Sequence, residues 1–105
     1  MGTAERTFSP EAGEGQLLML VVDDEQDLRD TLTRSFARQG HEVVAVADGP
    51  AALAQAARRD FDVVLLDVDL GSVGPDGYDV CRTLRSRRNY APIIMLTALD
   101  SEADA

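Results

Sequence analysis

Acidic residues stand where two strongly apolar segments of the sequence end. Asp23 and Asp24 follow the run 17–22, and Asp67 follows the run 63–66. Asp24 alone could equally be a helix N-cap. Three converging carboxylates are different, because two unit charges about 5 Å apart repel by roughly 3 kcal/mol at an effective dielectric constant near 20. Oxygen ligands completed by water suit Mg²⁺, which neutralises a phosphoryl group during transfer. We therefore expect a magnesium and phosphoryl-transfer site.

The elements that position these acids alternate along the chain. Runs that are apolar on both faces are typical of strands inside a parallel sheet covered by helices. We predict strands over residues 17–22, 42–47, 61–66 and 93–96, and helices over 25–39, 51–58 and from Tyr78 to before Asn89. Gly40 stands where a left-handed helix cap is wanted, and Asp48 with Pro50 is a helix-start signal. The βαβαβαβ pattern specifies a parallel sheet with right-handed crossovers.

All strands of a parallel sheet end at one edge, and ligands of open α/β sheets bind there. The fourth predicted strand ends at Thr97, so Thr97 joins Asp23, Asp24 and Asp67 at this edge.

Composition limits the classes of function. The chain has 105 residues, 45% of them hydrophobic, and a formal net charge of −9. Such a charge argues against direct binding of nucleic acid or of an anionic membrane. The longest apolar run is too short to span a membrane, and the N-terminus has no apolar export segment. With Cys81 as the one cysteine, we expect a reducing, cytoplasmic location. Residues 1–16 are polar and rich in Gly and Glu, and we predict a disordered leader there.

Five segments, in order, resemble the receiver domain of bacterial two-component response regulators: VVDDE at 21–25, DGPAAL at 48–53, FDVVLLD at 61–67, DG at 76–77 and PIIMLTA at 92–98. The resemblance covers residues 17–105. It implies a flavodoxin-like fold, a three-layer αβα sandwich whose parallel sheet has the strand order 2-1-3-4-5. It also implies a phosphorelay module and not an enzyme, beyond self-phosphorylation and self-dephosphorylation.

The resemblance assigns roles to single residues. Asp67 would be the phosphoacceptor that attacks a phosphohistidine on a sensor histidine kinase or phosphotransfer protein. Asp24 would bind Mg²⁺ directly, Asp23 mostly through water, and Asp69 through its backbone carbonyl. Thr97 would hydrogen-bond the phosphoryl oxygen and move its loop as a switch. The face of the first helix would meet the kinase, with Gln26, Arg29 and Thr33 as candidate contacts.

The sequence departs from the family pattern in two places. Gly71 takes the place of a proline four residues after Asp67, and the following Gly77 comes two residues late. The fifth strand, with its lysine, and the last helix are not in this sequence, whose 10 basic residues are all arginine. The resemblance thus implies a receiver that is incomplete over residues 17–105. The strand at 93–97 would then leave an open apolar edge, for which we expect self-association.

Two other functions compete with the receiver. The segment LLDVD at 65–69 also fits the start of a haloacid-dehalogenase-type phosphatase, but that class carries the motif on its first core strand and needs a later lysine. A receiver-like interaction module that is never phosphorylated is the second alternative, favoured by the missing lysine. Labelling with acetyl phosphate and Mg²⁺ distinguishes the receiver from the interaction module, and turnover of a phosphomonoester such as p-nitrophenyl phosphate would indicate the phosphatase.

Overall fold

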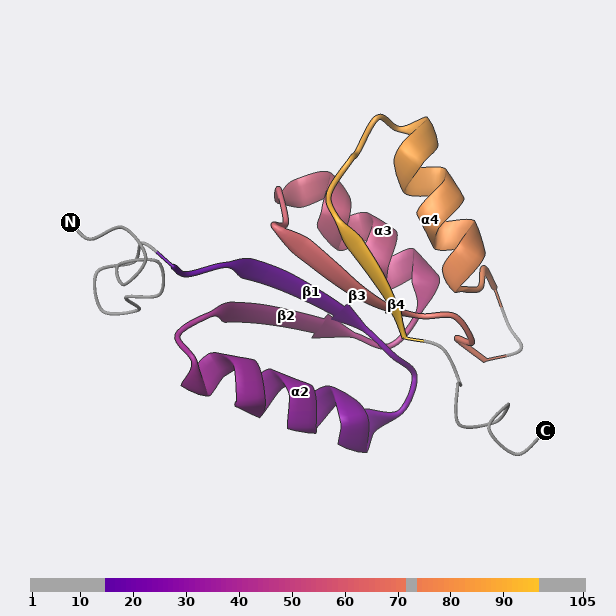
Figure 1. Cartoon of the computed structure of the whole chain (residues 1–105). Helices are drawn as coiled ribbons and strands as arrows, with labels where there is room; N and C mark the ends of the chain where they lie inside the picture. Colours follow the sequence, from indigo (N-terminus) through magenta and orange to yellow (C-terminus); the bar gives the residue numbers. More distant parts are fainter. Residues whose placement is uncertain (1–14, 72–73, 97–105) are drawn as a thin grey trace.

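The computed structural model describes residues 15–71 and 74–96 (Figure 1). Strands and helices alternate through this part of the chain. Their order is β1 (Leu18–Val22), α2 (Gln26–Arg38), β2 (Glu42–Val46), α3 (Gly49–Arg58), β3 (Val63–Asp67), α4 (Gly77–Ser86) and β4 (Ile93–Leu96). The predicted alternation of elements is confirmed.

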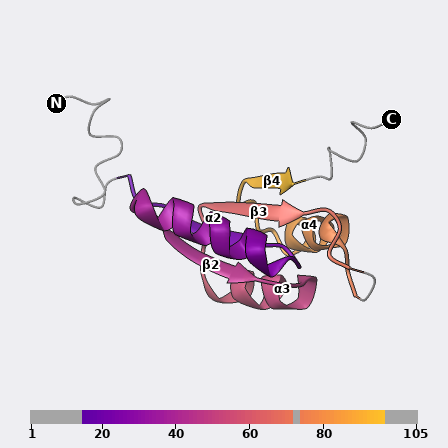
Figure 2. The same cartoon turned by 90° about the horizontal axis from the view of Figure 1, so that it is seen from below.

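The four strands form one parallel sheet in the order β2-β1-β3-β4. Figure 2 shows β2, β3 and β4 running in the same direction. The resemblance implied this order, and the structure confirms it for these strands. In the register of the sheet, Val22 pairs with both Val46 and Leu66, and Asp67 pairs with Leu96. The strand ends that carry Asp23 and Asp67 are therefore next to each other.

Helices cover both faces of the sheet, as a three-layer αβα sandwich requires (Figure 1). Helices α3 and α4 pack against each other and against one face, where Leu20, Leu66 and Val80 are fully buried. Helix α2 covers the other face over Met19 and Val21. The sheet is buried on both sides where β1 and β3 lie, which explains their unbroken apolar sequences.

The helix boundaries confirm the predicted start and stop signals. The Asp48 side chain accepts a hydrogen bond of 2.8 Å from the amide of Ala51 at the start of α3, with proline in the first turn. Gly40 has a φ of 94° after α2, a left-handed conformation that glycine adopts without strain. At the start of α4, Asp76 and Asp79 form a reciprocal capping box.

Several predicted boundaries were wrong by one or two residues. The third strand begins at Val63 and includes Asp67, since Asp67 still pairs with Leu96. Helix α4 ends at Ser86, because Arg88 turns into the left-handed region with a φ of 62°.

Some predictions fall on residues outside the described ones. Thr97 is such a residue, and so is all of the predicted leader except Gly15 and Gln16. Within the described residues, β4 pairs only with β3, and Ile94 on it is 53% exposed. Self-association through this edge stays a prediction. None of the described helices is both long and apolar enough to cross a membrane.

Candidate functional site

Asp23 is the most constrained residue of the candidate site. It directly follows β1 and is 3% exposed. Its amide donates to the carbonyl of Val46 on β2 (3.1 Å), and its Oδ1 accepts from the amide of Glu25 (2.8 Å). Its carbonyl accepts from Nη1 of Arg29 on α2 (2.8 Å). A buried carboxylate is costly unless it is hydrogen-bonded, and the Glu25 amide compensates part of that cost, while the other two contacts fix the backbone of Asp23.

The three predicted acids converge. Asp23, Asp24 and Asp67 each contribute one carboxylate oxygen, and these oxygens lie within 4.8 Å of one another. Asp23 is buried, Asp67 is partly exposed and Asp24 is exposed, so the cluster opens to solvent on one side. Hard carboxylate oxygens at this spacing, with room for water, fit the ligand requirements of Mg²⁺.

Electrostatics at the cluster favour a cation. Burial, and then the charges of Asp23, Asp24 and Asp69, raise the pKa of Asp67 above its usual range. The hydrogen bond from the amide of Asp69 to Oδ1 of Asp67 (3.1 Å) lowers this pKa and opposes the rise in part. Ionised Asp67 is thus held among like charges, and a divalent ion would relieve that repulsion.

The loop after β3 approaches the acids closely. The Gly71 amide donates to Oδ1 of Asp69 (3.1 Å), and Leu70 is anchored in the core at 4% exposure. A Cβ on Gly71, whose φ is 90°, would lie 3.6 Å from Oδ2 of Asp24. The residue that replaces the family's proline therefore lies beside a candidate metal ligand.

Gly77, the first residue of α4, lies against the backbone of Asp67 and Val68. Its amide donates to the carbonyl of Val68 (2.9 Å), and a Cβ on Gly77 would lie 2.2 Å from the carbonyl oxygen of Asp67. Only glycine fits between the start of α4 and the end of β3. From the sequence, Gly77 was predicted only as a glycine that comes two residues late after Asp67, and this contact was not predicted. The Asp-Gly pair ahead of a helix was the available signal.

The predicted site residues thus fall into three groups. Asp23, Asp24 and Asp67 are brought together. Asp69 is adjacent through its amide, and its carbonyl's role stays a prediction. Thr97 lies outside the described residues.

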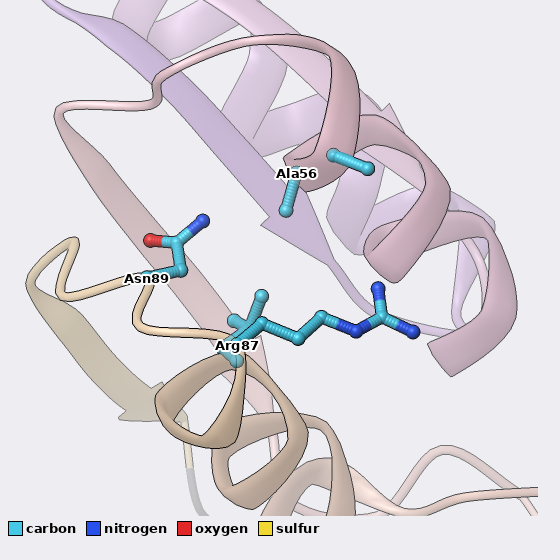
Figure 3. A pocket seen from close by; sticks show the side chains of 5 residues that line it. Ala56, Arg87 and Asn89 are labelled. Carbon is cyan, nitrogen blue, oxygen red and sulfur yellow. The ribbon is translucent and has the colours of Figure 1, made fainter.

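A separate pocket of about 240 Å³ lies between α3 and α4 and contains none of these acids. Figure 3 shows Ala56 on α3 facing Arg87 and Asn89, which follow α4. The pocket is lined by Ala56, Ala57, Leu84, Arg87 and Asn89. Its lining is mostly apolar and offers no carboxylate for a metal.

Comparison with known proteins points to one family. A family model described as the response regulator receiver domain matches residues 19–105. The sensory transduction protein RegX3 of Mycobacterium tuberculosis is 48% identical over 86 residues, which are 82% of this chain and 37% of RegX3. The alkaline phosphatase synthesis transcriptional regulatory protein PhoP of Bacillus subtilis is 41% identical over 82% of this chain and 35% of PhoP. The chain spans about a third of the length of these curated relatives.

Solved structures agree with these relatives. The receiver domain of the Francisella response regulator 1452 has a TM-score of 0.74 and 27% identity, covering 84% of this chain and 71% of that one. The response regulator TrrA of Thermotoga maritima, solved in complex with Mg²⁺ and BeF, has a TM-score of 0.70 and 33% identity. That match covers 78% of this chain and 70% of TrrA.

Proposed function

This chain belongs to the response regulator receiver domain family, and on that premise we propose that Asp67 accepts a phosphoryl group in a Mg²⁺-dependent reaction. The observation that carries the proposal is the convergence of three carboxylate oxygens within 4.8 Å of one another at the carboxyl edge of the sheet. The family is a signalling module and not a catalytic enzyme, which leaves the phosphatase alternative without support.

The two oxygens of Asp67 have different surroundings. Oδ1 accepts the hydrogen bond from the Asp69 amide, whereas Oδ2 accepts none from the described residues. Oδ2 is therefore the better nucleophile. Attack forms the Oδ2–P bond of an acyl phosphate and breaks the P–N bond of a phosphohistidine, whose ring nitrogen takes the electron pair.

Asp23 and Asp24 would hold Mg²⁺ together with Asp67 and, by the family's pattern, with the backbone carbonyl of Asp69. When bound, Mg²⁺ supplies the positive charge that neutralises the phosphoryl oxygens during transfer. Asp23 keeps its position through its hydrogen bonds to β2 and α2. Thr97, which follows β4 in the sequence, completes the proposal as the hydrogen-bond donor to the phosphoryl group.

The partner in this proposal is a sensor histidine kinase or a phosphotransfer protein in the cytoplasm. The relatives' names describe sensory transduction and transcriptional regulation, which fits a receiver that takes its signal from such a donor. Direct binding of nucleic acid or membrane by these residues is not part of the proposal, in view of the net charge of −9.

Labelling with a small phosphodonor tests the function. The protein is incubated with acetyl phosphate and Mg²⁺, and its intact mass is measured with and without a chelator. We expect a gain of one phosphoryl group that requires Mg²⁺ and is lost in Asp67→Asn.

The matched control is Asp62→Asn, which changes an aspartate at the opposite end of the same strand and should keep the labelling. A wild-type chain that gains no phosphate, or an Asp67→Asn variant that still gains one, would contradict the proposal. The first of these results supports the alternative of an interaction module that is not phosphorylated.

A further inference from the structure

Arg29 lies in the early part of α2 and is turned back toward the acidic cluster. It is partly buried, and its Nη1 donates to the backbone carbonyl of Asp23 at 2.8 Å. Elsewhere in the described part of the chain, arginine side chains donate to Glu42, Asp79, Asn89 and Ala91. Among these hydrogen bonds, only that of Arg29 reaches a member of the cluster.

This hydrogen bond stabilises the turn between β1 and α2, in which few other side-chain hydrogen bonds are made. Helix α2 begins at Gln26, and its N-cap, Glu25, makes no side-chain cap. Two other hydrogen bonds stabilise the turn between β1 and α2. The Glu25 amide donates to the Asp23 carboxylate, and the Arg29 guanidinium donates to the Asp23 carbonyl. Asp24 is inside this turn and exposed, so its direction depends on the same two contacts.

Arg29 donates to the backbone carbonyl of Asp23 and not to its carboxylate, and this difference matters for binding of a cation. A guanidinium on a carboxylate of the cluster would occupy an oxygen that a cation needs. Arg29 donates to the carbonyl, so Oδ2 of Asp23 accepts no hydrogen bond from the described residues. The contact therefore fixes the turn without competing for the ligand oxygens.

We propose that Arg29 is a positioning residue, which holds the β1–α2 turn so that Asp23 and Asp24 present their carboxylate oxygens to the cation. This inference rests on the proposed Mg²⁺ site. Only Nη1 of the guanidinium donates within the domain, and the sequence-based interpretation of Arg29 as a contact for the kinase stays a prediction.

A positioning role and a purely electrostatic role of Arg29 predict opposite changes in Mg²⁺ affinity when Arg29 is replaced. Loss of a nearby positive charge would strengthen binding of a divalent ion, whereas loss of the hydrogen bond would weaken it. Arg29→Met removes both charge and donor at similar length. Arg29→Lys keeps the charge and one shorter donor. Arg34→Met is the matched control, since Arg34 is exposed on the same helix.

The experiment is a titration of each full chain with MgCl₂, followed by the amide chemical shifts of residues 23–25. We expect Arg29→Met to raise the Kd for Mg²⁺ about tenfold, the usual effect of removing a group that orients a ligand. Arg29→Lys should recover part of this loss. Arg34→Met should stay within about twofold of wild type, because solvent screens an exposed charge.

Two further readouts separate positioning from stability. Thermal unfolding without metal checks that each variant is folded. In acetyl phosphate labelling, Arg29→Met should raise the half-saturating Mg²⁺ concentration while the rate at saturating Mg²⁺ stays within about twofold, because the attacking carboxylate is unchanged.

Unchanged or tighter Mg²⁺ binding in folded Arg29→Met would overturn the proposal, and so would an equal loss in Arg34→Met. If the wild-type chain binds Mg²⁺ and is labelled, such a result rejects only the role of Arg29. If the wild-type chain does not bind Mg²⁺ at all, the proposed function and the role of Arg29 fail together.

Discussion

Asp62 directly precedes β3 and Asp67 is its last residue, and the two aspartates have different surroundings. Oδ2 of Asp62 accepts from the amide of Leu18 (2.7 Å), and its own amide donates to the Leu18 carbonyl (2.8 Å). Asp62 thus satisfies both backbone groups at the start of β1. Asp67 accepts from the Asp69 amide and otherwise faces other carboxylates.

The residues around Asp62 and around Asp67 differ in the same way as the two aspartates do. At the amino edge of the sheet, Nδ1 of His41 accepts from the amide of Leu17 (3.0 Å), and Glu42 pairs with Arg59 (3.0 Å). Polar side chains there complete the backbone of the first strand. At the carboxyl edge Asp23 and Asp67 each accept one backbone amide, and their carboxylates also lie against one another and against Asp24. Asp62, at the amino end of β3, is therefore structural, whereas Asp67, at the carboxyl end of the same strand, is left available for a cation.

Gly77→Ala should have the largest effect at the carboxyl edge. The new Cβ would lie 2.2 Å from the carbonyl oxygen of Asp67, so either α4 or the end of β3 must move. We expect a loss of about 3 kcal/mol in the free energy of unfolding, measured in urea, together with loss of phosphoryl labelling.

Gly74→Ala is the control in the same loop. Its φ is +83° but its Cβ would meet nothing within 4 Å, so only backbone strain of about 1 kcal/mol is expected. Equal losses in the two variants would show that contact with Asp67 is unimportant.

Asp62→Ala tests the amino edge. It removes the acceptor of the Leu18 amide, and we expect the free energy of unfolding to fall by about 1.5 kcal/mol, the scale of a hydrogen bond to a charged group. Mg²⁺ binding and labelling should not change. A loss of Mg²⁺ affinity in this variant would break the distinction between the two edges.

Asp67→Asn should have the smallest effect on stability and the opposite sign. Burial and neighbouring carboxylates raise the pKa of Asp67 in the folded state, so the folded chain binds this proton more tightly than the unfolded chain. The stability that comes from protonated Asp67 is complete below the unfolded pKa and is lost as pH rises through the folded pKa.

Without Mg²⁺ at neutral pH, Asp67→Asn should therefore be more stable than wild type, by about 1 kcal/mol or roughly 4 °C in Tm. The advantage should shrink as pH falls through the raised pKa of Asp67 in the folded state, and it should be gone below about 4, the ordinary range of an aspartate. Thermal melts at several pH values measure it. An advantage that is the same at every pH, or a less stable variant at neutral pH, would contradict the assignment.

Much of the fold and part of the site could be predicted from the sequence. Parallel strands end at one edge, so Asp23, Asp24 and Asp67 could be placed at that edge from the apolar runs, and the strand order implied by the family resemblance placed them next to one another. The roles of Arg29 and Gly77 could not. Whether an arginine on a helix points to solvent or back to the preceding strand depends on the turn between them, and a glycine's neighbours are set by packing.

The sequence by itself determined which segments become strands and helices, because hydrophobic period and cap residues are local signals. It also determined that the acids stand at strand ends. Only the tertiary structure decided which acids face one another and which pair with backbone amides, because both outcomes require the same side chain. That choice depends on register and on turns whose contacts, such as Arg29 with the Asp23 carbonyl, join residues that no periodicity connects.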